Sequence, residues 1–146
     1  MKKILFGLFT AWAVSQAAAA EGNWLTDLPK SLEQAKAEKK VVLVNFTGSD
    51  WCGWCKRLDK EVFTTTEFKE YATKNLVLVE ADFPERKKQS SELKKANDGL
   101  KNKYKVDGFP TLVVLNGEGR EMGRQVGYLE GGPKAFIAML ETFKKK

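Results

Sequence analysis

The feature that most constrains this chain is its alternation of strand-like and helix-like segments. A continuous apolar run from Val41 to Phe46 is typical of a buried strand, and a second run extends from Leu76 to Ala81. Apolar residues at helical spacing lie before, between and after these runs, in the segments 31–39, 55–63, 67–74, 87–104 and 133–143. This alternation predicts an α/β fold.

The last third of the chain adds a hairpin. Two strand-like segments, 111–115 and 121–126, flank an Asn116-Gly117 dipeptide, which is a strong hairpin signal. Strands interleaved with helices, followed by a hairpin and a final helix, predict a central mixed β-sheet flanked by helices on both faces. The Asn97-Asp98-Gly99 segment is where a kink or split of the 87–104 helix is expected.

The first twenty residues have the pattern of a secretory signal peptide. Two lysines precede an apolar stretch from Ile4 to Val14, and Ala18-Ala19-Ala20 fits the small-residue cleavage site. An uncleaved anchor is the alternative, but the apolar stretch is shorter than the roughly 20 residues that span a bilayer. We therefore expect residues 1–20 to be removed, and residues 21–146 to form one domain in the periplasm or outside the cell.

The composition excludes several kinds of site. The chain has two cysteines and no histidine, so Ser-His or Cys-His catalysis and mixed Cys/His zinc sites are impossible. Lysines of the segment 87–105 share one side of the predicted helix, opposite its apolar residues. That separation is typical of a solvated helix face, and we expect no binding of nucleic acid.

Both cysteines lie where the strand 41–46 is expected to lead into a helix. Cys52 would stand at the helix N-terminus, where unpaired backbone N–H groups and the helix dipole favour a thiolate. Cys55 would lie one turn further along, in a more enclosed position from which it can attack a mixed disulfide formed at Cys52. The spacing predicts Cys52 as the attacking thiol and Cys55 as the resolving thiol.

Two other uses of the cysteine pair are less favoured. A structural disulfide across so short a loop would stabilise the fold by only about 2 kcal/mol in the chain-entropy view. A copper or zinc site held by the two thiolates lacks any histidine or further cysteine to complete its ligands. We therefore favour a redox pair that needs no metal and no cofactor.

The chain also resembles the thioredoxin superfamily over nearly all of residues 21–146. The resemblance is carried by the segment from Val41 to Val62, by Gly-Phe-Pro-Thr at 108–111, and by the closing hairpin and helix. It is strongest toward exported members and the thioredoxin-like C-terminal domain of the membrane reductase DsbD. The resemblance implies the thioredoxin fold, with Pro110 as a cis-proline facing the cysteines and Phe109 contacting an extended substrate segment.

One departure from the family concerns proton transfer. Asn45 stands where the family usually has a buried aspartate, and an amide cannot relay a proton. Asp59 lies four residues beyond Cys55, on the same helical face, and is the candidate proton relay. The alternative is an ordinary surface aspartate beside Lys56 and Lys60.

The residues around Cys52 bear on redox potential and on binding. The Gly53-Trp54 dipeptide between the cysteines lacks the histidine that strongly oxidising relatives carry, which predicts a reducing or intermediate potential. Trp51 and Trp54 flank Cys52 and, with Gly53, are expected to form an apolar rim for a partner.

The sequence thus predicts a monomeric, exported thiol–disulfide oxidoreductase acting on protein disulfides, with a membrane-bound or soluble partner that reduces it. Two alternatives belong to other classes: a non-catalytic thioredoxin-like binding module and a copper-binding dithiol protein. The long segment between residues 81 and 108 either serves a partner or lengthens a helix.

Overall fold

The computed structural model describes residues 23–145, so the predicted signal peptide lies outside the described residues. Its centre is one four-stranded sheet in the order β2-β1-β3-β4. The strands are β1 (Val41–Thr47), β2 (Leu76–Asp82), β3 (Thr111–Leu115) and β4 (Glu121–Val126). β1 is parallel to β2 and antiparallel to β3, and β3 is antiparallel to β4, so the sheet is mixed as predicted.

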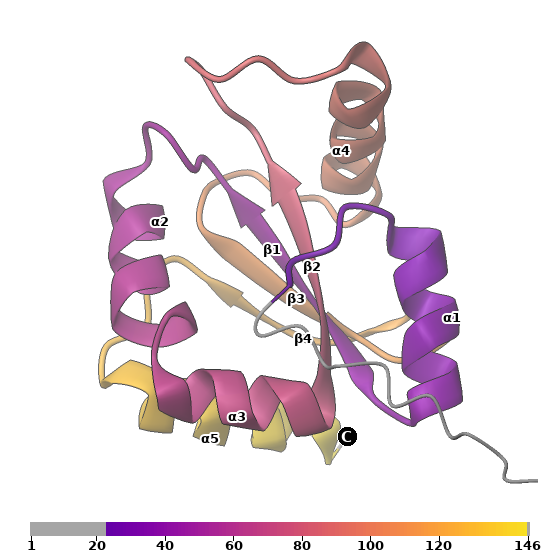
Figure 1. Ribbon diagram of the computed structural model, residues 1–146, viewed down its shortest axis with the longest axis vertical. Helices are drawn as coiled ribbons and strands as arrows, with labels where there is room; N and C mark the ends of the chain where they lie inside the picture. The colour runs from indigo at the N-terminus through magenta and orange to yellow at the C-terminus, as the bar shows by residue number, and fades with distance from the viewer. Residues whose placement is uncertain (1–22, 146) are drawn as a thin grey trace, which may run out of the picture.

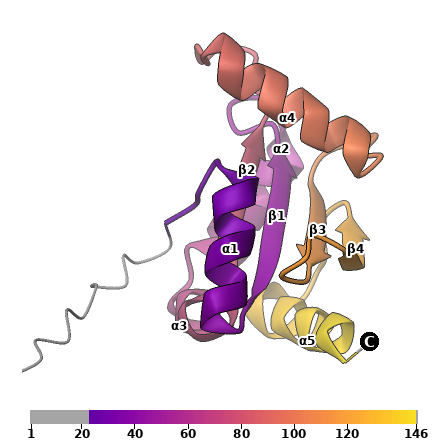
Figure 2. The ribbon, with the colours of Figure 1, turned by 90° about the vertical axis from the view of Figure 1, so that its right-hand side faces the viewer.

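Helices cover both faces of this sheet (Figure 1), as the sequence predicts. On one face lie α1 (Leu28–Glu38) and α4 (Ser91–Lys103). On the other face, called here the redox face, lie α2 (Gly53–Leu58), the π-helix η1 (Asp59–Phe63), α3 (Thr66–Asn75) and α5 (Gly132–Lys144). Turned by 90°, α4 and α5 lie at opposite ends of the molecule (Figure 2). Within residues 23–145, no helix combines the length and apolarity that crossing a bilayer requires.

The strand periodicity decides which residues meet which helices. Side chains alternate along β1, so Val44 and Phe46 join the core beneath α1 and α4, whereas Leu43 joins the core of the redox face. Asn45 follows Leu43 by two residues and therefore points to the redox face as well. β1 is buried along nearly its whole length because it lies between β2 and β3 and is covered by helices on both sides.

The segment after β2 differs from the sequence prediction. α4 begins at Ser91 rather than at residue 87, because the Ser90 hydroxyl accepts a hydrogen bond from the Leu93 N–H (3.1 Å) and caps the helix there. The expected break at residues 97–99 is absent from α4. Asn97 is buried instead, and its side-chain amide donates to the Asp82 carbonyl (2.9 Å), fastening the helix to the end of β2.

Candidate redox-active site

Cys52 and Cys55 form a disulfide at the start of α2, with their Cα atoms 5.2 Å apart. Cys52 is the N-cap residue of the helix, as the sequence predicts, and its Sγ accepts a hydrogen bond from the Cys55 N–H (3.2 Å). This N–H belongs to the first helical turn, where donors lack partners within the helix. The same donor would stabilise a Cys52 thiolate once the disulfide is reduced.

Exposure does not separate the two cysteines. Their relative exposures are 6% for Cys52 and 5% for Cys55, so burial in the oxidised chain does not distinguish an enclosed Cys55 from an accessible Cys52. What differs is position: Cys52 caps the helix, whereas Cys55 lies within it. Leu58, one turn beyond Cys55, packs into the core of the redox face. The side of α2 that carries Cys55 therefore faces the sheet.

The Phe109–Pro110 peptide bond is cis, as the resemblance implies. Two hydrogen bonds hold the chain around it. The Pro110 carbonyl accepts from the Gly127 N–H (2.8 Å) at the end of β4, and the Thr111 hydroxyl donates to the Gly108 carbonyl (2.7 Å). Pro110 is thereby fixed at the start of β3, next to the central strand β1 that leads to the cysteines.

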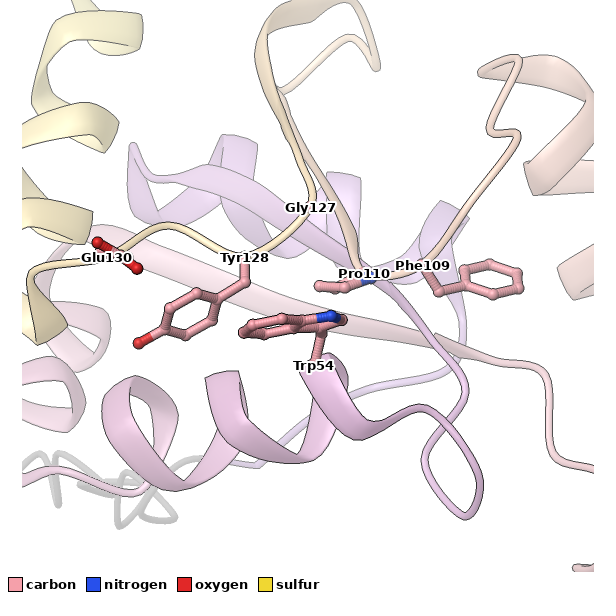
Figure 3. Close-up of a pocket in the computed structure, with 6 residues that line it drawn as sticks. All are labelled: Trp54, Phe109, Pro110, Gly127, Tyr128 and Glu130. Atoms are coloured by element: carbon pink, nitrogen blue, oxygen red, sulfur yellow. The ribbon is translucent and has the colours of Figure 1, made fainter.

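An open groove of about 400 Å³ lies beside the disulfide. It is lined by Trp54, Phe109, Pro110, Gly127, Tyr128 and Glu130. Figure 3 shows the Trp54 ring, carried by α2, lying against the Tyr128 ring with Pro110 beside them. The two rings are stacked with centroids 5.5 Å apart. Trp54, which lies between the two cysteines in the sequence, is 56% exposed, so the groove presents apolar surface to solvent.

A charged pair supports this aromatic stack. The Arg57 guanidinium lies 4.8 Å from the Tyr128 ring centroid and 5.5 Å from that of Trp54, and it pairs with Glu61 (2.9 Å). The Tyr128 hydroxyl donates to the same carboxylate. This hydrogen bond and the Arg57 pair lower the pKa of Glu61, which stays ionised and holds both partners in place.

The other tryptophan, Trp51, is not among the residues that line the groove, but it packs against one of them. Trp51 packs edge-to-face on Phe109 with ring centroids 6.0 Å apart, and its Nε1–H donates to the Phe83 carbonyl (2.8 Å). A side chain at Gly48 would overlap the Trp51 ring, so this position needs glycine. Trp51 and Trp54 are both exposed, and Phe109, which Trp51 contacts, lines the groove together with Trp54. Their service as one rim for a partner stays a prediction. Gly53 is exposed beside Trp54.

The two residues of the proton-transfer hypothesis lie in different surroundings. Asn45 is buried on β1, and its Oδ1 has no hydrogen-bond partner among the described residues. Asp59 is exposed at the first position of η1. Its role as a relay stays a prediction. Across residues 23–145, no three His, Cys, Asp or Glu side chains come together as a metal site.

Sequence reasoning missed the groove residues that follow β4. These residues are Gly127, Tyr128 and Glu130, more than seventy residues beyond the cysteines. The sequence of this turn contains no motif that indicates a redox site. Only the antiparallel pairing of β3 with β4 brings this turn beside Pro110.

Asp50 ties the redox loop to the segment after β2. Its carboxylate accepts backbone N–H hydrogen bonds from Glu85 (3.0 Å), Arg86 (2.7 Å) and Lys87 (2.8 Å). These donors lower the pKa of Asp50 to about 2. The long insertion that the sequence left without a role is thus attached directly to the loop that precedes Cys52.

We predict that the attachment made by Asp50 is lost only in strong acid. A carboxyl group whose pKa is depressed in the folded state stabilises it above the ordinary value of 3.8, and that contribution disappears as the pH falls through about 2. Amide hydrogen exchange at residues 85–87 should therefore stay slow at pH 4. In Asp50→Asn it should be faster at pH 4, while exchange in β1 is unchanged. Equal exchange at residues 85–87 in both proteins would contradict this role.

The chain is similar to several known proteins of thiol–disulfide chemistry. The family described as thioredoxin-like domain matches residues 28–144. The disulfide bond reductase DsbH of Chlamydia pneumoniae is 38% identical over 128 residues, covering 88% of this chain and 76% of that protein. DsbD of Vibrio cholerae, a thiol:disulfide interchange protein, is 31% identical over 126 residues, but only 20% of its length is covered. A solved structure titled DsbH oxidoreductase covers 95% of both chains with a TM-score of 0.80 and 34% identity.

Proposed function

The chain belongs to the thioredoxin-like domain family, and from this membership we propose that it reduces disulfides of other proteins through Cys52 and Cys55. The observation that carries the proposal is the disulfide at the N-terminus of α2, beside an exposed apolar groove and the cis Pro110. A disulfide that served only stability would need no such groove. The relatives named as reductase and interchange proteins support the same activity.

The reaction proceeds by two exchanges. In the reduced chain the Cys52 thiolate attacks one sulfur of a substrate disulfide; a Cys52–substrate disulfide forms, and the first substrate thiolate leaves. Cys55 then loses its proton and attacks Cys52 Sγ. The mixed disulfide breaks, the second substrate thiolate leaves and the Cys52–Cys55 disulfide forms. Two electrons pass to the substrate, and the departing thiolates take up protons from solvent.

We assign substrate binding to the groove. Trp54 and Tyr128 offer stacked rings to an apolar side chain near the substrate cysteine, and Phe109 and Pro110 form the opposite wall. A polypeptide lying in extended form between these walls would bring its sulfur to Cys52. Glu130 stands at the rim and would favour a positively charged neighbour in the substrate.

We propose that electrons flow from the reduced chain to the substrate disulfide. The dipeptide between the cysteines carries no histidine to stabilise the Cys52 thiolate, so the reduced form gains less stabilisation than in a strong oxidant. We expect titration with glutathione to give a potential between about −270 mV, as in thioredoxin, and about −180 mV, as in protein disulfide isomerase. A chain with such a potential should also catalyse the reduction of insulin by dithiothreitol. A potential near about −120 mV, as in DsbA, would overturn the reducing direction.

We further propose that the chain works outside the cytosol as a monomer. The signal pattern in residues 1–20 supports export, which would bring the redox pair into a compartment where protein disulfides persist. Each turnover leaves Cys52 and Cys55 oxidised, so a membrane-bound or soluble reductant must return two electrons. Sequencing the N-terminus of the purified mature protein tests export, and Glu21 is the expected first residue.

A further inference from the structure

The carboxylate of Glu80 lies on the sheet face that α2 covers. Glu80 on β2 is the direct register partner of Asn45 on β1, and paired residues of neighbouring strands point to the same face. Leu78, two residues before Glu80, belongs to the core of the redox face, as does Leu43, two residues before Asn45. Glu80 therefore points to the redox face, where it is half-buried.

The same face carries the resolving cysteine from the helix side. Leu58 on α2 packs into one core with Leu43 and Leu78. Cys55 precedes Leu58 by three residues and shares its side of the helix. Cys55 and Glu80 thus approach the same layer, one from the helix above it and the other from the strand below it.

The surroundings of Glu80 raise the pKa of its carboxyl group above the ordinary value. Burial raises the pKa of its carboxyl group; the Asp82 carboxylate adds to the rise, Lys87 opposes it and Asp59 adds to it from the helix layer. A base whose pKa lies closer to neutrality takes up a proton more effectively than an ordinary surface carboxylate. Asp59, Asp82 and Lys87 are the charged groups that act on it.

Asn45 can accept a hydrogen bond in the layer between Cys55 and Glu80, but it cannot act as the base. Its Oδ1 is buried and has no hydrogen-bond partner among residues 23–145. A buried acceptor left without a donor is costly, so a thiol or a water molecule arriving beside it is favoured. An amide can accept that hydrogen bond but cannot take the proton, whereas the carboxylate on the paired strand can.

From this layer we propose that Glu80 accepts the proton of Cys55 when the mixed disulfide is resolved. The step rests on the exchange reaction proposed above. The Cys55 S–H bond breaks and its proton passes to the Glu80 carboxylate, directly or through one water beside Asn45. The Cys55 sulfur then bonds to Cys52 Sγ, and the electron pair of the broken Cys52–substrate bond leaves with the substrate thiolate. Protonated Glu80 returns its proton to solvent.

The test measures resolution alone. A mixed disulfide between Cys52 and a thiol chromophore is formed by rapid mixing, and its decay is followed by stopped flow from pH 5 to pH 9. In Glu80→Gln, decay near pH 6.5 is expected to slow about 100-fold, the lower end of what general base catalysis contributes. The difference should shrink at high pH, where hydroxide removes the proton. The first step, attack by Cys52, should keep its rate.

Two further variants distinguish the loss of a proton acceptor from a structural effect of the substitution. Glu33→Gln changes an exposed carboxylate of α1, on the other side of the sheet, and should leave the profile unchanged. Asn45→Asp combined with Glu80→Gln moves the carboxylate to the paired strand and should restore most of the rate. An unchanged profile in Glu80→Gln, or no rescue by the double variant, overturns the role of Glu80. Failure of the unaltered chain to form or resolve the mixed disulfide would instead refute the proposed function.

The unaltered chain offers an independent measurement. The carboxyl carbon of Glu80, followed by NMR during a pH titration, is expected to report a different pKa in the reduced and oxidised chains. The reason is that only the reduced form has a Cys55 thiol to share its proton. Identical titrations in the two states would overturn the proposal even where Glu80→Gln fails to fold.

Discussion

Replacing Cys52 by serine is expected to lower the rate of insulin reduction by at least about 1,000-fold, because a hydroxyl at the helix N-terminus supplies no thiolate. The fold should be retained, since the short loop closed by the disulfide contributes only about 2 kcal/mol to stability, and nothing when both proteins are compared in the reduced state. Circular dichroism and the thermal midpoint provide that control. Retention of even a tenth of the activity would show that Cys52 is not the attacking thiol.

Cys55→Ser is expected to lose the second exchange step while keeping the first. Cys52 can still attack, but nothing resolves the product, so a mixed disulfide accumulates and is seen by non-reducing electrophoresis and mass spectrometry. Expressed in its native compartment, this variant should capture substrate proteins.

Adding Trp54→Ala to Cys55→Ser should slow this capture without abolishing it, because the groove then lacks one wall. Capture of substrates by Cys52→Ser, through its remaining Cys55, would contradict the assignment. If Cys55→Ser captures no substrate protein, a non-catalytic binding module is favoured.

Removal of the Phe136 side chain is expected to destabilise the protein by about 3–5 kcal/mol, the usual cost of Phe→Ala in a core. Phe136 is fully buried on α5, and its ring lies 5.6 Å from that of Phe63 and 5.8 Å from that of Phe68. These rings join α5, η1 and α3. Phe136→Ala therefore removes contacts among three helices of the redox face at once, and the cavity cannot be closed by one helix moving.

The measurement is urea unfolding of the unaltered chain and the variant in the same redox state. Val126→Ala is a suitable control, because Val126 is 64% exposed and its loss should cost at most about 1 kcal/mol. A loss below about 1 kcal/mol in Phe136→Ala would show that the aromatic cluster relaxes to fill the space.

The main architecture could be predicted from the sequence because its signals are local. The apolar run at 41–46 and the Asn116-Gly117 turn specify a central strand and a hairpin, and both are present. The position of Cys52 at the start of α2 follows from the strand that precedes it and the helical spacing after it. The start of α4 was missed because Ser90, a hydroxyl cap among many polar residues, gives a weak signal beside the lysine periodicity.

The contacts of the candidate site that could not be predicted depend on pairing between segments far apart in the sequence. Nothing in the letters around Tyr128 indicates that it stacks on Trp54, because the contact is made by the strand order of the sheet. Asp50 likewise contacts the backbone of a loop that begins 35 residues further along the chain. Glu80 is paired with Asn45, which also lies 35 residues away. A search along the cysteine helix alone leads to Asp59, which is exposed and whose role as a relay stays a prediction.

The low exposure of both sulfur-bearing residues, 6% and 5%, has a consequence for the chain among other thiols. Exchange rates depend on access to the attacked sulfur as well as on thiol chemistry. A small thiol such as glutathione gains no binding energy from the groove, whereas a polypeptide that fills it does. We therefore expect glutathione to exchange slowly with the Cys52–Cys55 disulfide, and a polypeptide that fills the groove to exchange faster.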